Sequence, residues 1–201
     1  MSVEHQIAQR IESLQKGGLL FPVDFSDLGS SEAVRLSLFR LEKQGVISRV
    51  AQGIYVSPKK SALIGKLLPT AEEVVEAIVK RDKIRAVPTG SYALNALGLS
   101  TQVPMNIVML SDGSPREIKL GKRKIKFKRT TPKNLMAKGK ISRLVIQALK
   151  EIGNGMLRED EEKKINELLK KEEKTDLIHD IKLAPVWIQK IMIKGFNDGK
   201  K

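Results

Sequence analysis

The chain has 201 residues, a formal net charge of +14 and no cysteine. This length suggests one or two domains, and the absence of cysteine excludes disulfide bonds and thiolate chemistry. The two histidines, His5 and His179, are far apart in sequence and have no cysteine to complete a zinc site, so we expect neither a metal nor a cofactor. No apolar run is long enough to cross a bilayer and no apolar signal core begins the chain, which predicts a soluble, cytoplasmic protein without a membrane partner.

The positive charge is concentrated in one part of the chain. Residues 101–150 hold thirteen Lys and Arg against two Asp and Glu, an excess of +11. The excess is +2 in residues 1–60, +1 in residues 61–100 and zero in residues 151–201. Such an excess favours a polyanionic partner, and the alternative is a surface that only keeps the protein soluble.

The first residues predict two helices. Apolar residues repeat at helical spacing over Val3–Gln15, and Gly17-Gly18 ends this helix. Proline is tolerated in a first turn, so Pro22 can open a second helix over Val23–Leu28, with Phe25 as its core contact.

The stretch from Gly29 to Val56 predicts a third helix. Ser30 can cap it, because its hydroxyl can accept a hydrogen bond from a free N–H of the first turn. Gly45 supplies the left-handed residue that ends many helices. The apolar stripe at i, i+4 and i+7 consists of Val34, Leu38 and Leu41.

A two-stranded ribbon follows this helix at once. Ile47–Val50 and Ile54–Val56 alternate around the loop Ala51-Gln52-Gly53, which ends in glycine. A helix followed by such a ribbon is typical of the second half of a winged helix-turn-helix, in which the helix enters the major groove of DNA. The alternative is a small helical hairpin with a solvated basic face.

Polar and basic residues on the outward surfaces of this helix and ribbon are the candidate DNA contacts. Arginine can bind phosphate or guanine edges bidentately. Leu36 and Phe39 also point outward at 100° per residue, where they contact either thymine methyl groups or another domain. The candidate contacts are Ser31, Arg35, Arg40, Lys43, Arg49 and Gln52.

Residues 61–135 predict a second, mixed α/β domain. The segment Ser61–Pro69 is a linker or a strand, and its apolar residues Leu63, Ile64, Leu67 and Leu68 predict that it is docked. Thr70 caps the next helix, and Glu73 lies at the spacing of a capping box. A strand at residues 84–87, a short helix at residues 91–97 closed by glycine, and a strand at residues 106–110 follow.

The basic stretch Ser114–Arg129 predicts a hairpin with one apolar and one lysine face. Ile125 and Phe127 alternate with Lys124, Lys126 and Lys128, and these three lysines are further candidate DNA contacts. Lysines also protect exposed strand edges from pairing, so edge protection is the alternative.

Residues 136–201 predict a helical C-terminal part. Apolar stripes begin near residue 142, between residues 159 and 171, near residue 177 and after Pro185. The fold class is therefore α+β, with a winged helix-turn-helix at residues 1–60, an α/β domain at residues 61–135 and helices at residues 136–201.

The motif GLSTQVP at residues 98–104, together with the preceding ribbon, resembles the AbiEi family. These proteins are the antitoxin components of type IV toxin–antitoxin pairs, and the resemblance covers roughly residues 5–135. It implies that the winged domain binds inverted repeats in double-stranded promoter DNA and represses transcription. It also implies that the second domain neutralises a nucleotidyltransferase toxin.

We find no constellation of catalytic residues and expect no enzyme. Gly90-Ser91 is similar to the start of a nucleotidyltransferase motif, but the paired carboxylates that hold magnesium are missing, since Asp112 stands alone. The alternative function is an RNA-binding module that uses the basic hairpin. Single-strand binders stack bases on aromatic rings, and the only aromatic residue of the hairpin is on its apolar face.

Overall fold

The computed structural model describes residues 1–61 and 65–197 and has a mixed α+β fold, 49% helical and 17% strand. The chain divides into two compact units, Met1–Lys80 with Ile118–Arg123 and Arg81–Glu117 with Lys124–Lys201. We call them the N-terminal and the second unit. The predicted boundaries at residues 60 and 135 stay predictions.

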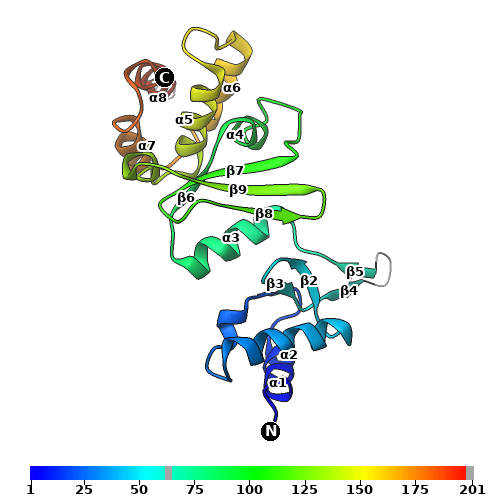
Figure 1. The fold of residues 1–201 in the computed structure, drawn as a ribbon. Helices are drawn as coiled ribbons and strands as arrows, with labels where there is room; N and C mark the ends of the chain where they lie inside the picture. The colour runs from blue at the N-terminus through cyan, green and yellow to red at the C-terminus, as the bar shows by residue number, and fades with distance from the viewer. Residues whose placement is uncertain (62–64, 198–201) are drawn as a thin grey trace. The chain divides into compact units, whose positions relative to one another are not determined.

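The N-terminal unit is built on two helices, α1 (Val3–Ser13) and α2 (Ser31–Lys43), which lie side by side in Figure 1. The predicted cap of α2 is confirmed, because the Ser30 hydroxyl accepts a hydrogen bond from the Ala33 N–H at 3.2 Å. The predicted stripe is also confirmed. Its three residues are buried together with the following core residues: Ile7, Ile11, Leu20, Phe25, Ile47 and Tyr55.

The segment between these helices differs from the predicted α-helix. Leu19–Leu20 is a strand, β1, and Pro22–Phe25 is one turn of 3-10 helix, η1. The Asp24 carboxylate accepts the N–H of Phe21 at 2.8 Å and so closes this turn. The backbone here makes hydrogen bonds between residues three apart, from the Ser26 N–H to the Val23 carbonyl at 3.2 Å and from the Leu28 N–H to the Phe25 carbonyl at 3.0 Å, which is the pattern of 3-10 turns and not of an α-helix. Phe25 is buried, as predicted.

The hairpin after α2 consists of β2 (Ser48–Ala51) and β3 (Ile54–Val56). Gly53 has a φ of +68°, which suits the turn, because glycine adopts positive φ without steric cost. β3 also pairs with β1, and the three-stranded sheet has the order β1-β3-β2. The predicted hairpin is thus present, and it gains a third strand that the sequence did not predict.

The segment after the hairpin forms a ribbon of its own. β4 (Lys59–Ser61) pairs antiparallel with β5 (Gly65–Leu67). Leu67 and Leu68 are exposed, so the prediction that they are docked is wrong. Pairing of β4 with β5 buries neither of these two leucines. Leu63 and Ile64 lie outside the described residues.

The next helix, α3 (Ala71–Asp82), has the predicted capping box: Thr70 N–H donates to Glu73 at 2.7 Å, and Glu73 N–H donates to the Thr70 hydroxyl at 3.2 Å. A four-stranded sheet then forms in the order β6-β7-β9-β8. Its strands are β6 (Ala86–Pro88), β7 (Asn106–Ser111), β8 (Arg116–Leu120) and β9 (Arg123–Arg129). β9 pairs with β7 in parallel. The strand order therefore places β9 inside the sheet and β8 at its edge.

The remaining helices share one core, and Figure 1 shows them gathered around α5. A 3-10 turn, η2 (Pro132–Leu135), leads into α5, and the short helix α4 contributes Ala93 to the core. In the part of the chain that the structure describes, no helix is long and apolar enough to cross a membrane. The helices are α4 (Gly90–Ala96), α5 (Lys140–Ile152), α6 (Glu159–Leu169), α7 (Lys174–Ile181) and α8 (Val186–Asn197).

Candidate nucleic-acid interface

The outward face of α2 carries most of the candidate contacts. The buried stripe fixes the rotation of the helix, and Ser31, Arg35 and Lys43 are exposed as a result. Leu36 and Phe39 are 51% and 50% exposed, which confirms that they point outward. The Lys43 ammonium lies 5.6 Å from the centroid of the Phe39 ring. The face therefore combines an apolar centre with cations at its sides.

Arg40 differs from the other cations of α2, because α1 holds its guanidinium group. The group lies 3.3 Å from the Glu4 carboxylate, which also accepts a hydrogen bond from Gln44 at 2.9 Å. This network links the C-terminal half of α2 to the first turn of α1. Arg35 has no such link among the residues that the structure describes.

Arg49 and Gln52, the candidates on the hairpin, are both exposed. The Arg49 Nε donates to the carbonyl of Ala51 at 3.4 Å, a weak contact within its own strand. The hairpin thus presents one cation and one amide beside α2 in the N-terminal unit.

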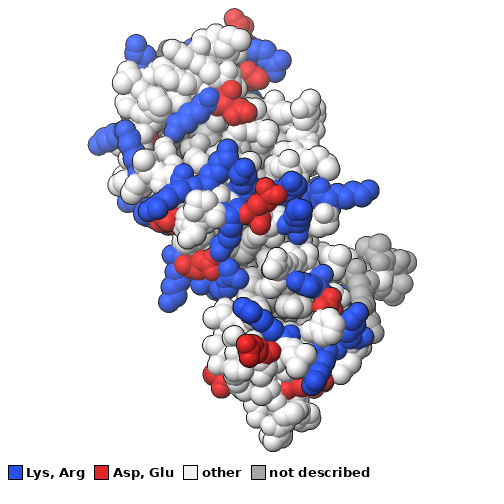
Figure 2. Space-filling model, viewed as in Figure 1, with Lys and Arg blue, Asp and Glu red and all other residues white. Residues whose placement is uncertain are grey.

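In the second unit, the lysine face is the exposed side of β9 that carries Lys124, Lys126 and Lys128. The alternating residues Ile125 and Phe127 are buried on the opposite side, as predicted. Because β9 lies between β7 and β8, these lysines do not protect a sheet edge, and that alternative is wrong for them. On the side drawn in Figure 2, basic side chains gather over the region of this sheet.

Lys124 is partly neutralised by Glu117 on β8, at 3.2 Å. Lys126 and Lys128 make no ion pair within residues 1–61 and 65–197. The charge of the lysine face that is available to a ligand therefore comes mainly from these two residues.

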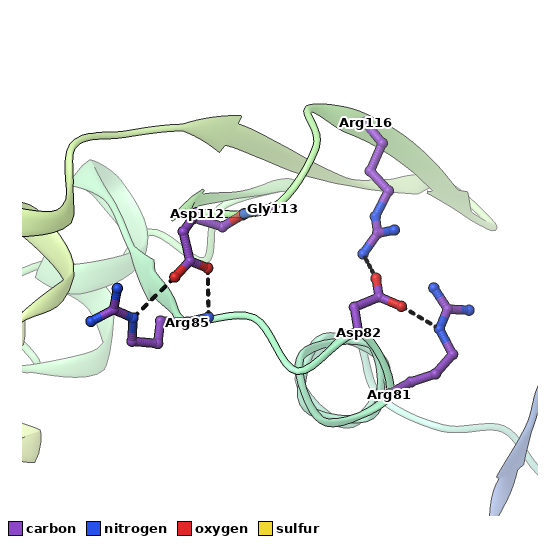
Figure 3. Close-up of polar contacts among 7 residues, drawn as sticks. Arg81, Asp82, Arg85, Asp112, Gly113 and Arg116 are labelled. Carbon is purple, nitrogen blue, oxygen red and sulfur yellow. Dashed lines mark hydrogen bonds and ion pairs between the residues drawn. The ribbon is translucent and has the colours of Figure 1, made fainter.

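Arg116 at the start of β8 is less available to a ligand than Lys126 and Lys128, because other residues of the unit bind its guanidinium group. Its guanidinium forms an ion pair with Asp82, which also binds Arg81 at 2.6 Å (Figure 3). It also lies over the Phe127 ring, 5.1 Å from the centroid. The hydrogen bond from Arg81, together with that from Arg116, holds the pKa of Asp82 below its usual value, against the opposing effect of burial. This cluster joins the end of α3 to the edge strand.

A second pair in Figure 3 joins the strands β6 and β7 at their ends. Asp112 accepts the backbone N–H of Arg85 at 2.8 Å and its guanidinium at 3.0 Å. Both bonds, the backbone one foremost, lower the pKa of Asp112. The Asp112 carboxylate thus holds the adjacent ends of β6 and β7 together. Among the described residues, no cluster of three or more His, Cys, Asp or Glu could hold a metal ion.

The candidates therefore form two sets: six residues in the N-terminal unit and three lysines in the second unit. Sequence reasoning missed the link between Arg40 and Glu4, because a pair separated by 36 residues leaves no periodic signal. It also missed a group of polar residues on α5 whose spacing, at residues 143, 147 and 150, places them on one helix face.

Comparison with known proteins gives one family match. The profile described as "Family of unknown function (DUF6088)" matches residues 6–177, which include most of α1, the helices α2 to α6 and all the strands that the structure describes. No curated protein matches the chain.

Proposed function

The chain belongs to the DUF6088 family, and we propose that it is a DNA-binding transcriptional regulator whose N-terminal unit acts as a winged helix-turn-helix. The observation that carries this proposal is the orientation of α2. Its stripe of Val34, Leu38 and Leu41 is buried, so a face with Arg35 and Lys43 points outward, and a short hairpin follows directly. A helix exposed in this way can enter the major groove, with the hairpin on the adjacent backbone.

The chemistry of this face suits base edges in duplex DNA. Arg35 can donate two hydrogen bonds to a guanine, while Leu36 and Phe39 can contact the methyl group of thymine. Arg49 on the hairpin suits a phosphate. The face would thus read both kinds of base pair, and the hairpin would fix its register.

The RNA-binding alternative is less well supported. Single-stranded RNA is usually held by aromatic rings exposed on a sheet. Phe127, the aromatic residue of β9, is only 1% exposed. In the sheet, the three lysines of this face lie opposite Asn106, Val108 and Leu110 of β7. None of these three residues has an aromatic ring that could stack on a base. Duplex DNA, which needs only backbone contacts from such a face, is the better partner.

We further propose an antitoxin role, which rests on the resemblance of residues 98–104 to the AbiEi family. In this proposal the second unit binds a nucleotidyltransferase toxin. Val103 and Met105 in and beside this motif are exposed, which suits contact with a protein. A toxin gene next to the gene for this chain is the expected arrangement.

Arg35→Ala is expected to weaken binding to a promoter repeat by about 1–3 kcal/mol, because alanine cannot donate the two hydrogen bonds to a base. Arg40→Ala should cost less, since Glu4 already holds that guanidinium. Fluorescence anisotropy with the promoter repeat and a random duplex measures both. Arg158→Ala, an exposed arginine on the second unit, is the matched control. If Arg35→Ala binds both duplexes as tightly as the native protein, α2 does not read DNA.

Replacing Lys126 and Lys128 with glutamine tests which partner the lysine face serves. If the face binds DNA, the slope of log K against log salt should flatten by about 0.9 for each phosphate that the variant no longer neutralises, with the specificity ratio unchanged. If it binds the toxin, the slope should stay constant and co-expressed toxin should stop growth. Lys163→Gln on α6 is the control. An unchanged slope with intact neutralisation would exclude the face from both roles.

A further inference from the structure

A small hollow lies in the second unit where η2 meets α5. Its volume is about 10 Å³, the space of one water molecule. Residues 143, 147 and 150 lie at i, i+4 and i+7 on α5 and so share one helix face. The polar residues that line the hollow are Lys133, Asn134, Arg143, Gln147 and Lys150.

The hollow brings three cations together without a counter-ion. No Asp or Glu lines it, and within the described residues none of the three cations makes an ion pair. Lys150 donates instead to the neutral amide of Asn134 at 3.1 Å. Burial lowers the pKa of Lys150, and the nearby charge of Lys133 lowers it further. Both lysines are exposed at the rim of the hollow, and an anion beside them would interact favourably with both ammonium groups.

Two further polar groups of the hollow have no partner. The Arg143 Nε is buried and makes no hydrogen bond with any described residue. Gln147 is only 7% exposed, and its side-chain amide makes no hydrogen bond within the part of the chain that the structure describes. A buried donor without a partner, as the Arg143 Nε is, is rare in folded proteins, because it costs free energy. Both would gain a partner if an acceptor entered the hollow.

We propose that this hollow is a binding site for a phosphate group. One oxygen enters the space of about 10 Å³, where it accepts hydrogen bonds from Arg143 and Gln147. The other oxygens stay at the rim, where the ammonium groups of Lys133 and Lys150 neutralise their charge. The group comes either from a free phosphorylated small molecule or from the backbone of a nucleic acid. The site is independent of the DNA contacts proposed for α2.

Titration of the full chain with inorganic phosphate tests the site, with chloride added to keep the ionic strength constant. NMR spectroscopy follows the amide signals of α5 and the pKa of Lys150. We expect saturable shifts at α5 and a higher pKa of Lys150 with phosphate bound, because the ligand replaces repulsion with attraction. If the pKa stays constant while phosphate is added, the proposal is wrong.

Lys133→Gln and Lys150→Gln should each weaken phosphate binding by about tenfold or more, as expected when a charge-assisted hydrogen bond is removed. Lys163→Gln removes the same charge from α6 and should leave binding unchanged. Equal affinity in Lys150→Gln and Lys163→Gln would show that phosphate responds only to net charge, which would overturn the proposal.

Gln147→Met keeps the volume of the side chain but removes its amide. If the amide serves the ligand, the variant should be at least as stable as the native chain and yet bind phosphate more weakly. If the variant instead loses stability and binds phosphate normally, the amide has a structural role and the site is wrongly assigned.

A short DNA duplex added to the phosphate-bound chain separates the two possible sources of the phosphate group, a nucleic-acid backbone and a free small molecule. If the duplex displaces inorganic phosphate, the site binds a phosphate of the nucleic-acid backbone. If the duplex and phosphate bind at the same time, the site serves a free phosphorylated molecule.

Discussion

Leu38→Asp is expected to unfold the N-terminal unit. Leu38 is 0% exposed and packs among Ile7, Phe25 and the other core residues of that unit. The variant would bury a carboxylate without a partner and lose the packing of the leucine, at a cost of more than about 4 kcal/mol. Far-UV circular dichroism should show the loss of α1 and α2. Trp187 fluorescence reports on the separate core of the second unit, and its transition in urea should remain.

The matched control is Leu36→Asp, two residues away on the same helix. Leu36 is half exposed, so its aspartate would be solvated and the change in stability should stay within about 0.5 kcal/mol. Equal unfolding of both variants would mean that the outward face of α2 is packed in solution. It would then be unavailable to DNA, and the proposed function would fail with it.

The helix α2 could be predicted from the sequence because its signals are local. Ser30, the apolar stripe and Gly45 all act within about one or two turns of the residues that they affect. The hairpin after it was predictable for the same reason, since a glycine at +68° marks its turn. The capping box of α3 is a third local signal, and its two hydrogen bonds form as the spacing predicts.

Features that depend on distant pairing could not be predicted. The two residues of β1 are a strand only because β3, more than thirty residues later, pairs with them. The position of β9 inside the sheet depends on its parallel pairing with β7. The lysine pattern is the same for an edge strand and a central strand, so only the sheet order excludes edge protection.

The candidate site was predictable to a similar degree. The helical period alone places Arg35, Leu36 and Phe39 on the outside, and all three are exposed. The period cannot show that Arg40 is bound by Glu4, because the pair depends on how α1 packs against α2. In the same way, the spacing on α5 places its polar residues on one face, but the contribution of Lys133 depends on the path of η2.

A buried carboxylate in the second unit organises the start of α5. Asp180 is 0% exposed and accepts the backbone N–H groups of Lys138 at 2.9 Å and Gly139 at 2.8 Å. It also binds the Ser142 hydroxyl and lies 2.8 Å from the Nδ1 of His179. These bonds hold the two residues that lead into α5, which itself begins at Lys140.

Glu172 completes this arrangement by accepting the N–H groups of Ile141 at 2.6 Å and Ser142 at 2.8 Å. A side chain on Gly139 would collide with the Ser142 hydroxyl and the Glu172 carboxylate and would displace both groups. Glu172 thus caps the first turn of α5 from outside, where the cap residue Gly139 has no side chain, and Asp180 holds the segment that precedes the helix. The negative charges also suit the positive end of the helix dipole.

Asp180→Ala is therefore expected to cost about 3–5 kcal/mol of the free energy of unfolding, because it leaves several buried donors without an acceptor. Urea unfolding followed by Trp187 fluorescence measures this loss in the second unit. Asp180→Asn keeps one acceptor oxygen and should lose less. Asp160→Ala removes an exposed carboxylate from the first turn of α6 and should change stability by no more than about 0.5 kcal/mol. If Asp180→Ala and Asp160→Ala have equal midpoints, the backbone N–H groups of Lys138 and Gly139 are satisfied without Asp180.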